Sequence, residues 1–361
     1  MKRVLIYIVG LFLSTAMSIA QEYEQAFRDL QLQYQERSNT VLTDVKSYLD
    51  TYPYTPYSDE VYFMEGVIHA EKGKYKQANR AFAKVDANNL SRESQPAFLF
   101  YWGYTFLQQK NYDRALTYFL RLKNQNSLYS PHARYYAGYC YYCQQDFQSA
   151  LAEFLSVEQL GGYQHIAPYY IIQIDYAQEN YDKVYQRANH LLEVFPDNKN
   201  NYELHRMLGE LYYQDKAYDQ AIEHLQAYYE HAKEQKQTPL RNDIYLLGVA
   251  SYKEAKYQDA VQYLKMVKEQ KDSISESTYL HLGHSYLRLE DQERAKLSYA
   301  AAMRFKINER LREEAMYNYV QITYLQGSAL GENITAFHDF LREYPNTQYA
   351  NKVYALMADM Y

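Results

Sequence analysis

Two short clusters of cysteine and histidine are the side chains in this sequence whose types and spacing could support chemistry. Cys140 and Cys143 form a Cys-x-x-Cys pair, a spacing used for thiol–disulfide exchange where a strand precedes the pair and a helix begins at its first cysteine. His281 and His284 lie one helical turn apart and could bind a metal ion if a third ligand converged on them. No third ligand is evident, and the cysteines lie in the middle of a helical pattern. We therefore expect both pairs to be structural, with no metal and no cofactor, and a functional thiol pair is the alternative for the cysteines.

Other catalytic patterns are absent from the sequence. It holds no phosphate-binding GxxxxGK[ST], no dinucleotide-binding GxGxxG, no HExxH and no GxSxG. Its ten histidines are scattered along the chain and no pair of carboxylates stands at matched positions, which leaves general acid–base catalysis without identifiable residues. The chain carries 38 Lys and Arg against 44 Asp and Glu, and a net charge of −6 argues against binding nucleic acid through phosphate contacts. We expect a protein that is not an enzyme and has no nucleic-acid partner.

Tyrosine is the unusual feature of the composition. The 361 residues include 45 Tyr, 14 Phe and 1 Trp, beside only 12 Gly, 8 Pro and 2 Cys. This aromatic content with modest charge excludes an intrinsically disordered chain, and two cysteines exclude a disulfide-stabilised scaffold. The high tyrosine content must therefore be explained by the secondary-structure elements in which the tyrosines lie.

One motif recurs along the chain and predicts its secondary structure. A Gly is followed nine residues later by an aromatic residue, three further by Ala and four further by a bulky residue, as in Gly66, Tyr75, Ala78 and Phe82. A small anchor lets the two helices of a hairpin approach closely, and the bulky residue fills the gap to the next hairpin. No alternating strand pattern of useful length is present, so the chain is expected to be all-helical. The anchors of successive copies, 34 to 39 residues apart, are Gly66, Gly103, Gly138, Ile172, Gly209, Gly248 and Gly283.

This motif resembles the tetratricopeptide repeat, which has a small residue in its first helix, an aromatic residue and an Ala in its second, and a closing Pro. The resemblance implies an all-α fold, a right-handed superhelical solenoid of helix hairpins. It also implies a non-enzymatic scaffold that binds a protein partner or an extended peptide on the inner surface lined by each first helix.

The copies and the irregular ends give the expected domain boundaries. Seven repeats cover 57–308, after a degenerate N-terminal capping helix pair over 21–56. A divergent eighth repeat over 309–345 and the first helix of an incomplete repeat over 346–361 follow. An array that ends halfway through a hairpin exposes an apolar face. We therefore expect either a longer protein or a partner chain that covers this end.

Residues 1–20 are typical of a secretory signal peptide. Lys2 and Arg3 precede an apolar run over 4–13 that is too short to span a bilayer, and the small residues Ser18 and Ala20 suit cleavage after Ala20. A membrane anchor is the alternative. We expect a mature chain without a transmembrane segment, located in the periplasm, with the cell surface or secretion as alternatives.

Two repeat junctions point to the same compartment. Residues 340–350 and 48–58 are similar to the junctions of bacterial envelope proteins. Those proteins include the repeat component of the outer-membrane barrel-assembly machinery and the periplasmic coordinator that works with the Tol-Pal system.

A stripe of aromatic residues on the first helices is the predicted binding surface. Offsets of −3, +1 and +4 from each anchor fall on one face of a helix. Tyr suits recognition there because it offers a large rigid contact area, a hydroxyl and few rotamers to freeze. Two alternatives stay open, since the same aromatics could bind a cell-wall glycan such as peptidoglycan or could pack half-buried between neighbouring helices. The predicted groove comprises Phe100, Tyr104, Tyr135, Tyr139, Tyr142, Tyr169, Tyr176, Tyr213, Tyr245 and Tyr252.

Overall fold

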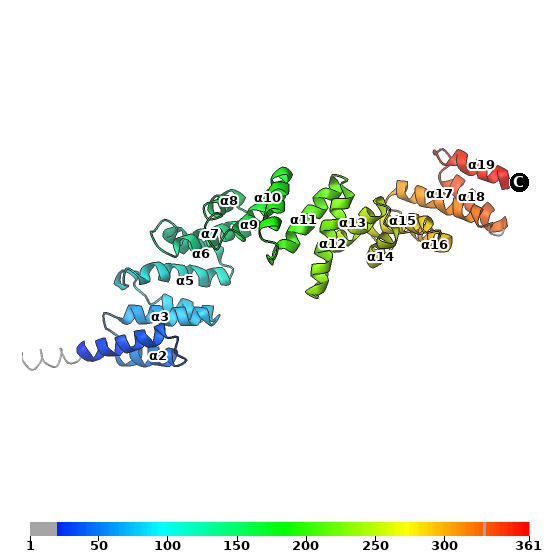
Figure 1. Ribbon diagram of the computed structural model, residues 1–361. Helices are drawn as coiled ribbons and strands as arrows, with labels where there is room; N and C mark the ends of the chain where they lie inside the picture. The colour runs from blue at the N-terminus through cyan, green and yellow to red at the C-terminus, as the bar shows by residue number, and fades with distance from the viewer. Residues whose placement is uncertain (1–19, 328–329, 361) are drawn as a thin grey trace, which may run out of the picture. The chain divides into compact units, whose positions relative to one another are not determined.

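The computed structural model describes residues 20–327 and 330–360, and over these residues the chain is helical with no strand (Figure 1). It divides into two compact units, Met1–Ala177 and Gln178–Tyr361. The predicted signal peptide lies, except for Ala20, outside the described residues. Within the described ranges, no helix combines the length and apolar character needed to cross a membrane.

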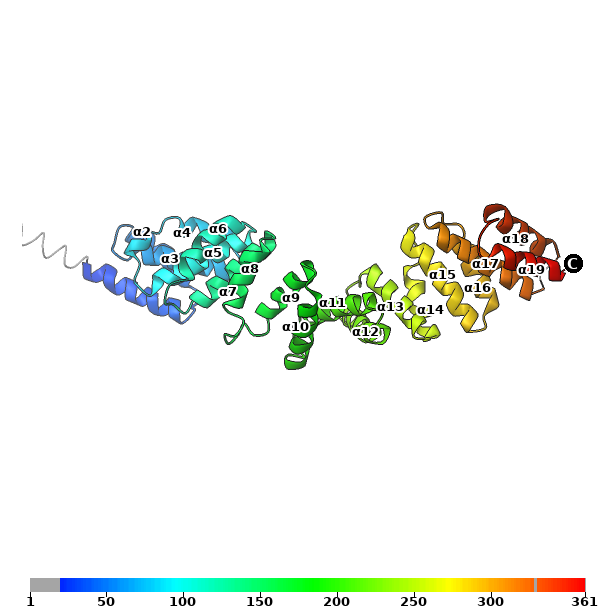
Figure 2. The same ribbon diagram turned by 90° about the horizontal axis from the view of Figure 1, so that it is seen from above.

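The first unit consists of helices that pack against their neighbours in sequence order (Figure 2). It begins with a helix over residues 20–35, whose Phe27 and Leu30 share a buried cluster with Val45 and Tyr48 of the next helix. The helices that follow are α2 (Val41–Thr51), α3 (Ser58–Glu71), α4 (Tyr75–Phe82), the 3-10 helix η1 (Ala87–Asn89), α5 (Ser94–Gln108), α6 (Tyr112–Leu122), α7 (Ser130–Cys143), α8 (Phe147–Leu155) and α9 (Ala167–Ala177).

The second unit continues the same pattern of paired helices. Its hairpins α11–α12, α13–α14 and α15–α16 each pack closely, and each also contacts the next hairpin. Its helices are α10 (Tyr181–Val194), α11 (Asn201–Gln214), α12 (Tyr218–Glu234), α13 (Arg241–Lys253), α14 (Tyr257–Val267), α15 (Ser273–Arg288), α16 (Gln292–Ala302), α17 (Glu309–Leu325), α18 (Leu330–Glu343) and α19 (Ala350–Met360).

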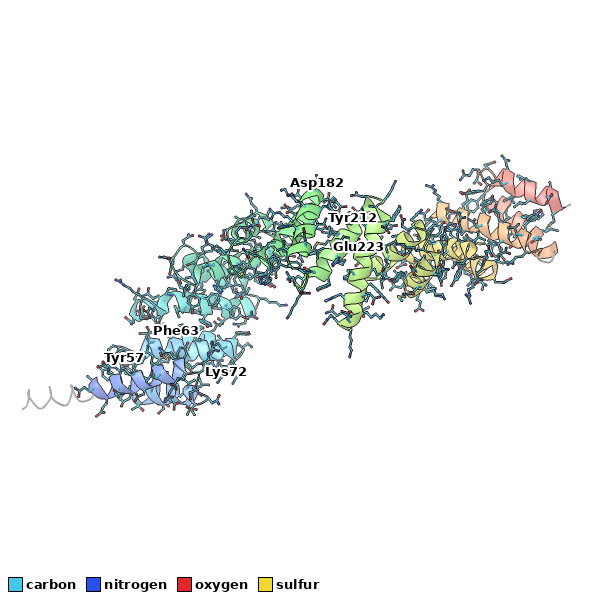
Figure 3. All side chains as sticks on the ribbon, in the orientation of Figure 1. Tyr57, Phe63, Lys72, Asp182, Tyr212 and Glu223 are labelled. Carbon is cyan, nitrogen blue, oxygen red and sulfur yellow. The ribbon has the colours of Figure 1, made fainter. Side chains whose placement is uncertain are left out.

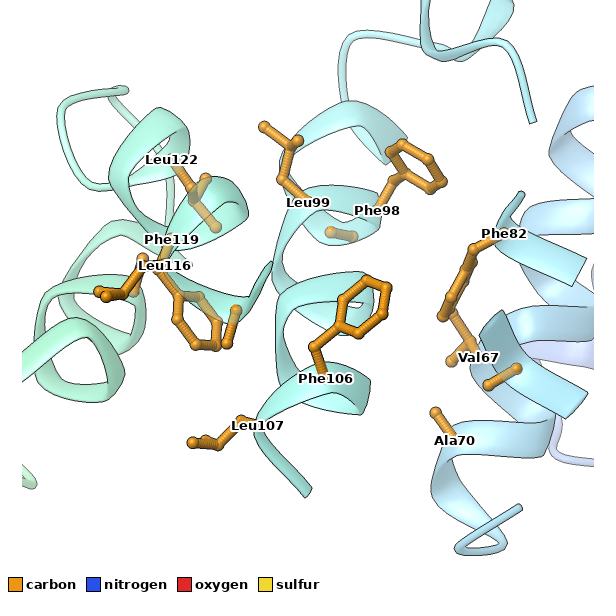
Figure 4. Packing of buried hydrophobic residues seen from close by; sticks show 14 of the residues in the cluster. Val67, Ala70, Phe82, Phe98, Leu99, Phe106, Leu107, Leu116, Phe119 and Leu122 are labelled. Atoms are coloured by element: carbon orange, nitrogen blue, oxygen red, sulfur yellow. The ribbon is translucent and has the colours of Figure 1, made fainter. Parts of the chain in front are cut away.

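Each anchor glycine lies against the bulky residue of its own hairpin. A Cβ on Gly66 would stand 2.2 Å from Cε1 of Phe82, and one on Gly248 would stand 2.7 Å from Cγ of Leu264. Phe82 also reaches the next hairpin, with its ring centroid 5.8 Å from that of Phe98 (Figure 4). The bulky residue therefore closes its own hairpin as well as filling the gap to the next one. This double contact explains why the anchor must be small.

The turns inside the hairpins share a backbone conformation that the sequence motif does not predict. Residues seven positions after the anchors have positive φ, a conformation that costs non-glycine residues about 1 kcal/mol. In some hairpins the following residue caps the second helix, as where Asn111 and Asp146 accept hydrogen bonds from the backbone N–H of Arg114 and Ser149. The positive φ values are 69° at Gly73, 58° at Lys110, 62° at Gln145, 60° at Glu179, 63° at Lys216, 55° at Ala255 and 61° at Glu290.

The boundary between the two units falls within the weakest copy of the motif. Ala177 ends α9 and the first unit, and α10 belongs to the second. This copy has Ile172 at its anchor and Ala188 at the bulky position, both fully buried, so large and small residues have exchanged places. The sequence predicts one unbroken series of seven repeats, and the structure divides that series at this copy.

Candidate partner-binding site

A cavity of about 310 Å³ lies in the first unit. It lies where the end of α5, the start of α6 and the faces of α7 and α9 meet. Five of its eight lining residues are tyrosines, and the exposed side chains of Gln108 and Lys110 stand at its rim. The lining residues are Leu107, Gln108, Lys110, Tyr112, Tyr135, Tyr136, Tyr139 and Tyr170.

The local sequence explains how the walls form. Tyr135 and Tyr139 are four residues apart on α7 and so share one face of that helix. Tyr170 of α9 meets Tyr139 edge-on with ring centroids 5.6 Å apart, and it stacks on Phe154 of α8 at 5.1 Å and 8°. Because Phe154 is fully buried, the Tyr170 ring is held in place from behind. The cavity is thus pre-formed by ring packing between hairpins.

The tyrosine hydroxyl groups of this cavity are polar and carry no charge at neutral pH. Burial raises the pKa of Tyr135, Tyr136, Tyr139 and Tyr170 above the ordinary value for tyrosine. The phenols therefore stay protonated and can both donate and accept hydrogen bonds. Lys110 is the charged residue of the lining. Such a site suits a large side chain with an apolar body and a polar or neutral end.

The two cysteines border this cavity without forming a disulfide. Both thiols are free, Cys140 is buried and Cys143 is half-buried. A hydrogen bond to the Cys143 thiol raises the pKa of Tyr112, and burial raises the pKa of the Cys140 thiol to about 12. The pair lies in the last turn of α7, whereas the sequence placed it in the middle of a helix. With no strand before the pair and no helix starting at Cys140, its setting is that of packing residues.

Two residues of the predicted groove in the first unit line this cavity, and the others pack beside it. Tyr135 and Tyr139 are in the lining, and Tyr135 keeps only 9% of its surface exposed. Phe100 and Tyr104 contact Tyr136, with ring centroids 5.9 and 5.6 Å away. Their rings are therefore half-buried between the α5 and α7 layers, as the packing alternative expects.

The remaining groove residues of this unit lie toward α9. Tyr142 hydrogen-bonds to the side chain of Gln173 and meets Tyr170 at 5.3 Å. Tyr169 contacts Tyr170 at 5.3 Å, and Tyr176 is half-buried. These side chains lie outside the cavity lining, so the predicted stripe does not form one continuous open surface here.

In the second unit the predicted groove residues serve mainly as packing groups. Tyr213 and Tyr245 are half-buried against two core clusters, and the Tyr245 hydroxyl lies 2.7 Å from Oγ of Ser277. Tyr252 packs against His281 and His284 with ring centroids 5.6 and 5.8 Å away. These rings are thus packed against side chains of the following hairpin.

Three cavity tyrosines lay outside the predicted stripe. Tyr136 and Tyr170 both stand two residues before an anchor, and Tyr112 is the aromatic residue that opens α6. The signal for the first two is present in the sequence, since the offset −2 carries Tyr in the second to fourth copies, including Tyr101. Tyr112 gave no such signal because its position is aromatic in most copies.

A charged cluster lies on α11 and α13, beside the groove tyrosines of these helices. Arg206 forms ion pairs with Glu203 and Glu210, both at 2.8 Å. Asp243 is 2% exposed, and burial followed by its hydrogen bond with Glu210 raises its pKa to about 8. At neutral pH the Asp243 carboxyl is therefore largely protonated and can donate a hydrogen bond to Glu210.

The histidine pairs of the second unit are packed side chains. His281 Nδ1 lies 2.8 Å from the backbone oxygen of Ser277, and burial lowers the pKa of His284 to about 4. A second pair, His205 and His224, approaches to 2.8 Å between Nδ1 atoms, and Tyr212 (Figure 3) stacks on His224. Among the residues that the structure describes, no three His, Cys, Asp or Glu side chains are grouped so that they could hold a metal ion.

Sequence comparison agrees with the helical-hairpin architecture. The chain is an all-helical repeat protein built from stacked hairpins. The tetratricopeptide repeat profile matches residues 63–131 and 175–236, so these segments carry repeats of that family. The comparison with curated protein sequences gives no match. Proteins built from such repeats are generally non-enzymatic scaffolds for protein–protein interaction.

Several solved structures are similar to this chain at low sequence identity. A tetratricopeptide repeat protein from Parabacteroides merdae is 16% identical with a TM-score of 0.45, over 83% of this chain and 99% of that one. The apo form of RapI is 14% identical with a TM-score of 0.48, over 94% and 96% of the two chains. The C-terminal part of a repeat-containing protein from Cytophaga hutchinsonii is 13% identical with a TM-score of 0.35, over 81% and 98%.

Proposed function

We propose that this protein is an exported scaffold of the bacterial cell envelope that binds an extended segment of a partner protein through the first unit. The observation that carries the proposal is the tyrosine-lined cavity between α5, α6, α7 and α9. Its volume of about 310 Å³ accommodates one large side chain of the partner. The half-buried rings of Phe100 and Tyr104 pack against Tyr136 and so support the cavity wall.

The chemistry of the cavity favours an aromatic or long aliphatic anchor residue. Aromatic walls give offset or edge-on ring contacts worth about 0.5–1.5 kcal/mol beyond the area they bury. The neutral hydroxyls can satisfy a polar end group without requiring a charge on the partner. Because the tyrosines are already fixed by their neighbours, little conformational entropy is lost on binding.

A paired pull-down from an envelope extract tests the binding surface. Tyr139→Ala enlarges the cavity and removes one wall, whereas Tyr54→Ala alters a tyrosine that is 98% exposed in a loop of the same unit. We expect Tyr139→Ala to lose a partner that the wild type and Tyr54→Ala both retain. Identical partner lists for all three proteins would refute the cavity as the binding site.

A glycan or peptidoglycan ligand is the alternative for the same aromatic surface. Sedimentation with purified cell wall separates the two functions, because a protein scaffold should stay in the supernatant.

Export is tested separately by mass spectrometry of the protein isolated from cells, whose first residue should be Gln21. Retention of residues 1–20 in the mature protein would overturn the expected cleavage and with it the periplasmic location.

A further inference from the structure

A second cavity, in the second unit, lies on a different face of the repeat from the predicted groove. Its volume is about 170 Å³, and it sits between α14, α15 and α16. The inward-stripe residues of α15, which are Leu280, His284 and Leu287, are not in its lining. The lining residues are Lys265, Lys268, Tyr279, Leu282, Tyr286, Arg294, Leu297 and Ser298.

The charges around this cavity are positive. The side-chain ammonium groups of Lys265 and Lys268 form no ion pair or hydrogen bond with any other residue that the structure describes. Arg294 lies over the Tyr286 ring at 5.8 Å and pairs with Asp291 at 3.1 Å, and no carboxylate is in the lining. Three cations and no carboxylate thus line this cavity, in a chain whose net charge is −6.

Uncharged donors complete the same cavity. The hydroxyls of Tyr279 and Tyr286 have no hydrogen-bond partner among the described residues, although Tyr286 is only 6% exposed. Leu282 forms an apolar floor, and Leu297 is a wall residue with 68% of its surface exposed. The cavity therefore offers ammonium, guanidinium and phenol donors beside an apolar surface.

The lysine pair is specific to this copy of the repeat. Lys265 and Lys268 stand 17 and 20 residues after the anchor Gly248. No other copy carries basic residues at both positions, so the pair is not part of the packing motif. The corresponding residues elsewhere are Ala83 and Asp86, Leu120 and Lys123, Leu155 and Glu158, Asn189 and Leu192, Gln226 and Tyr229, and Ala300 and Met303.

We propose that the cavity formed by Lys265, Lys268, Arg294, Tyr279 and Tyr286 is a binding site for the phosphoryl group of a phosphomonoester. A phosphate monoester carries a charge of about −1.5 to −2 at neutral pH, which matches the local positive charge. Its oxygens accept charge-assisted hydrogen bonds from Lys and Arg and ordinary ones from the phenols. The tyrosine rings and Leu297 then contact the organic part of the ester. This site does not depend on the partner-binding cavity of the first unit.

Isothermal titration calorimetry with phenyl phosphate, inorganic phosphate and benzoate tests the proposal on the mature chain. We expect one saturable site for phenyl phosphate, weaker binding of inorganic phosphate because the aryl contacts are lost, and little binding of the singly charged benzoate. Affinity should fall as NaCl is raised, since the site is partly open to solvent. Absence of saturable binding of either phosphate probe would overturn the proposal.

One double variant and a matched control test whether these lysines bind the phosphate. Lys265→Gln combined with Lys268→Gln should weaken phenyl phosphate binding at least about tenfold, because two charge-assisted hydrogen bonds are removed. Lys271→Gln changes an exposed lysine of the same segment that does not line the cavity, and its affinity should equal that of the wild type. Equal loss in the control, or unchanged affinity in the double variant with an unaltered circular-dichroism spectrum, would show that the phosphate binds elsewhere.

Discussion

The close approach of helices at the anchor glycines leads to a prediction about Gly66→Ala. The new Cβ would lie 2.2, 2.4 and 2.8 Å from Cε1, Cδ1 and Cζ of Phe82, well inside the roughly 3.5–4.0 Å of an ordinary carbon contact. Phe82 is fully buried and packs on Phe63, Phe98 and Trp102, so its ring cannot move aside without disturbing the next hairpin.

The expected magnitude follows from two opposing effects. Overpacking of a closed core costs about 1–3 kcal/mol or somewhat more, and Ala favours a helix interior over Gly by about 1 kcal/mol. Gly66→Ala should therefore lower the unfolding free energy of the first unit by about 1–2 kcal/mol. Gly138→Ala is the matched control, because its Cβ would stand 3.0 Å from the nearest atom of Phe154 and the two effects nearly cancel.

Urea unfolding followed by the fluorescence of Trp102 measures the effect. Trp102 is the sole tryptophan and lies in the first unit, with its ring 6.2 Å from Phe82. In a Phe82→Ala background, Gly66→Ala should become stabilising by about 1 kcal/mol, because the clash is gone and only helix propensity is left. Equal shifts for Gly66→Ala and Gly138→Ala, or an unchanged penalty in the Phe82→Ala background, would refute the packing explanation.

Two further predictions concern the second unit. Ala255→Gly places glycine at φ 55° in an exposed turn, where it avoids the backbone strain of alanine, and should raise the free energy of unfolding by about 0.5–1 kcal/mol. Urea unfolding measures this change, and a lower free energy of unfolding in the variant would contradict the strain assigned to this turn. Asp243 has a folded pKa of about 8, above the ordinary 3.8. The unfolded chain therefore releases this proton first, and stability should fall as pH rises from about 4 to about 8. Asp243→Asn should remove that fall, and parallel pH–stability curves for the wild type and the variant would show that the buried carboxyl is not its source.

The sequence by itself determined the hairpins. A glycine, an aromatic residue, an alanine and a bulky residue at fixed spacing define which face of each helix is buried, because the helical period fixes which side chains share a face. The second helices begin at the predicted aromatic residue, as α4 does at Tyr75 and α6 at Tyr112. Likewise, α2 buries Val41, Val45 and Tyr48, which the sequence placed on one face.

The tertiary structure alone decided which of these faces are covered by a neighbouring hairpin and which line a cavity. The period of a helix does not say how the next hairpin covers it, so the stripe through Phe100 and Tyr104 becomes packing while Tyr139 lines a cavity. Tyr170 joins that cavity from another hairpin, 31 residues along the chain from Tyr139. The residues of the proposed phosphate site likewise come from the region of three helices, α14, α15 and α16. Neither cavity can be predicted from a pattern within one helix, because each depends on how the hairpins stack.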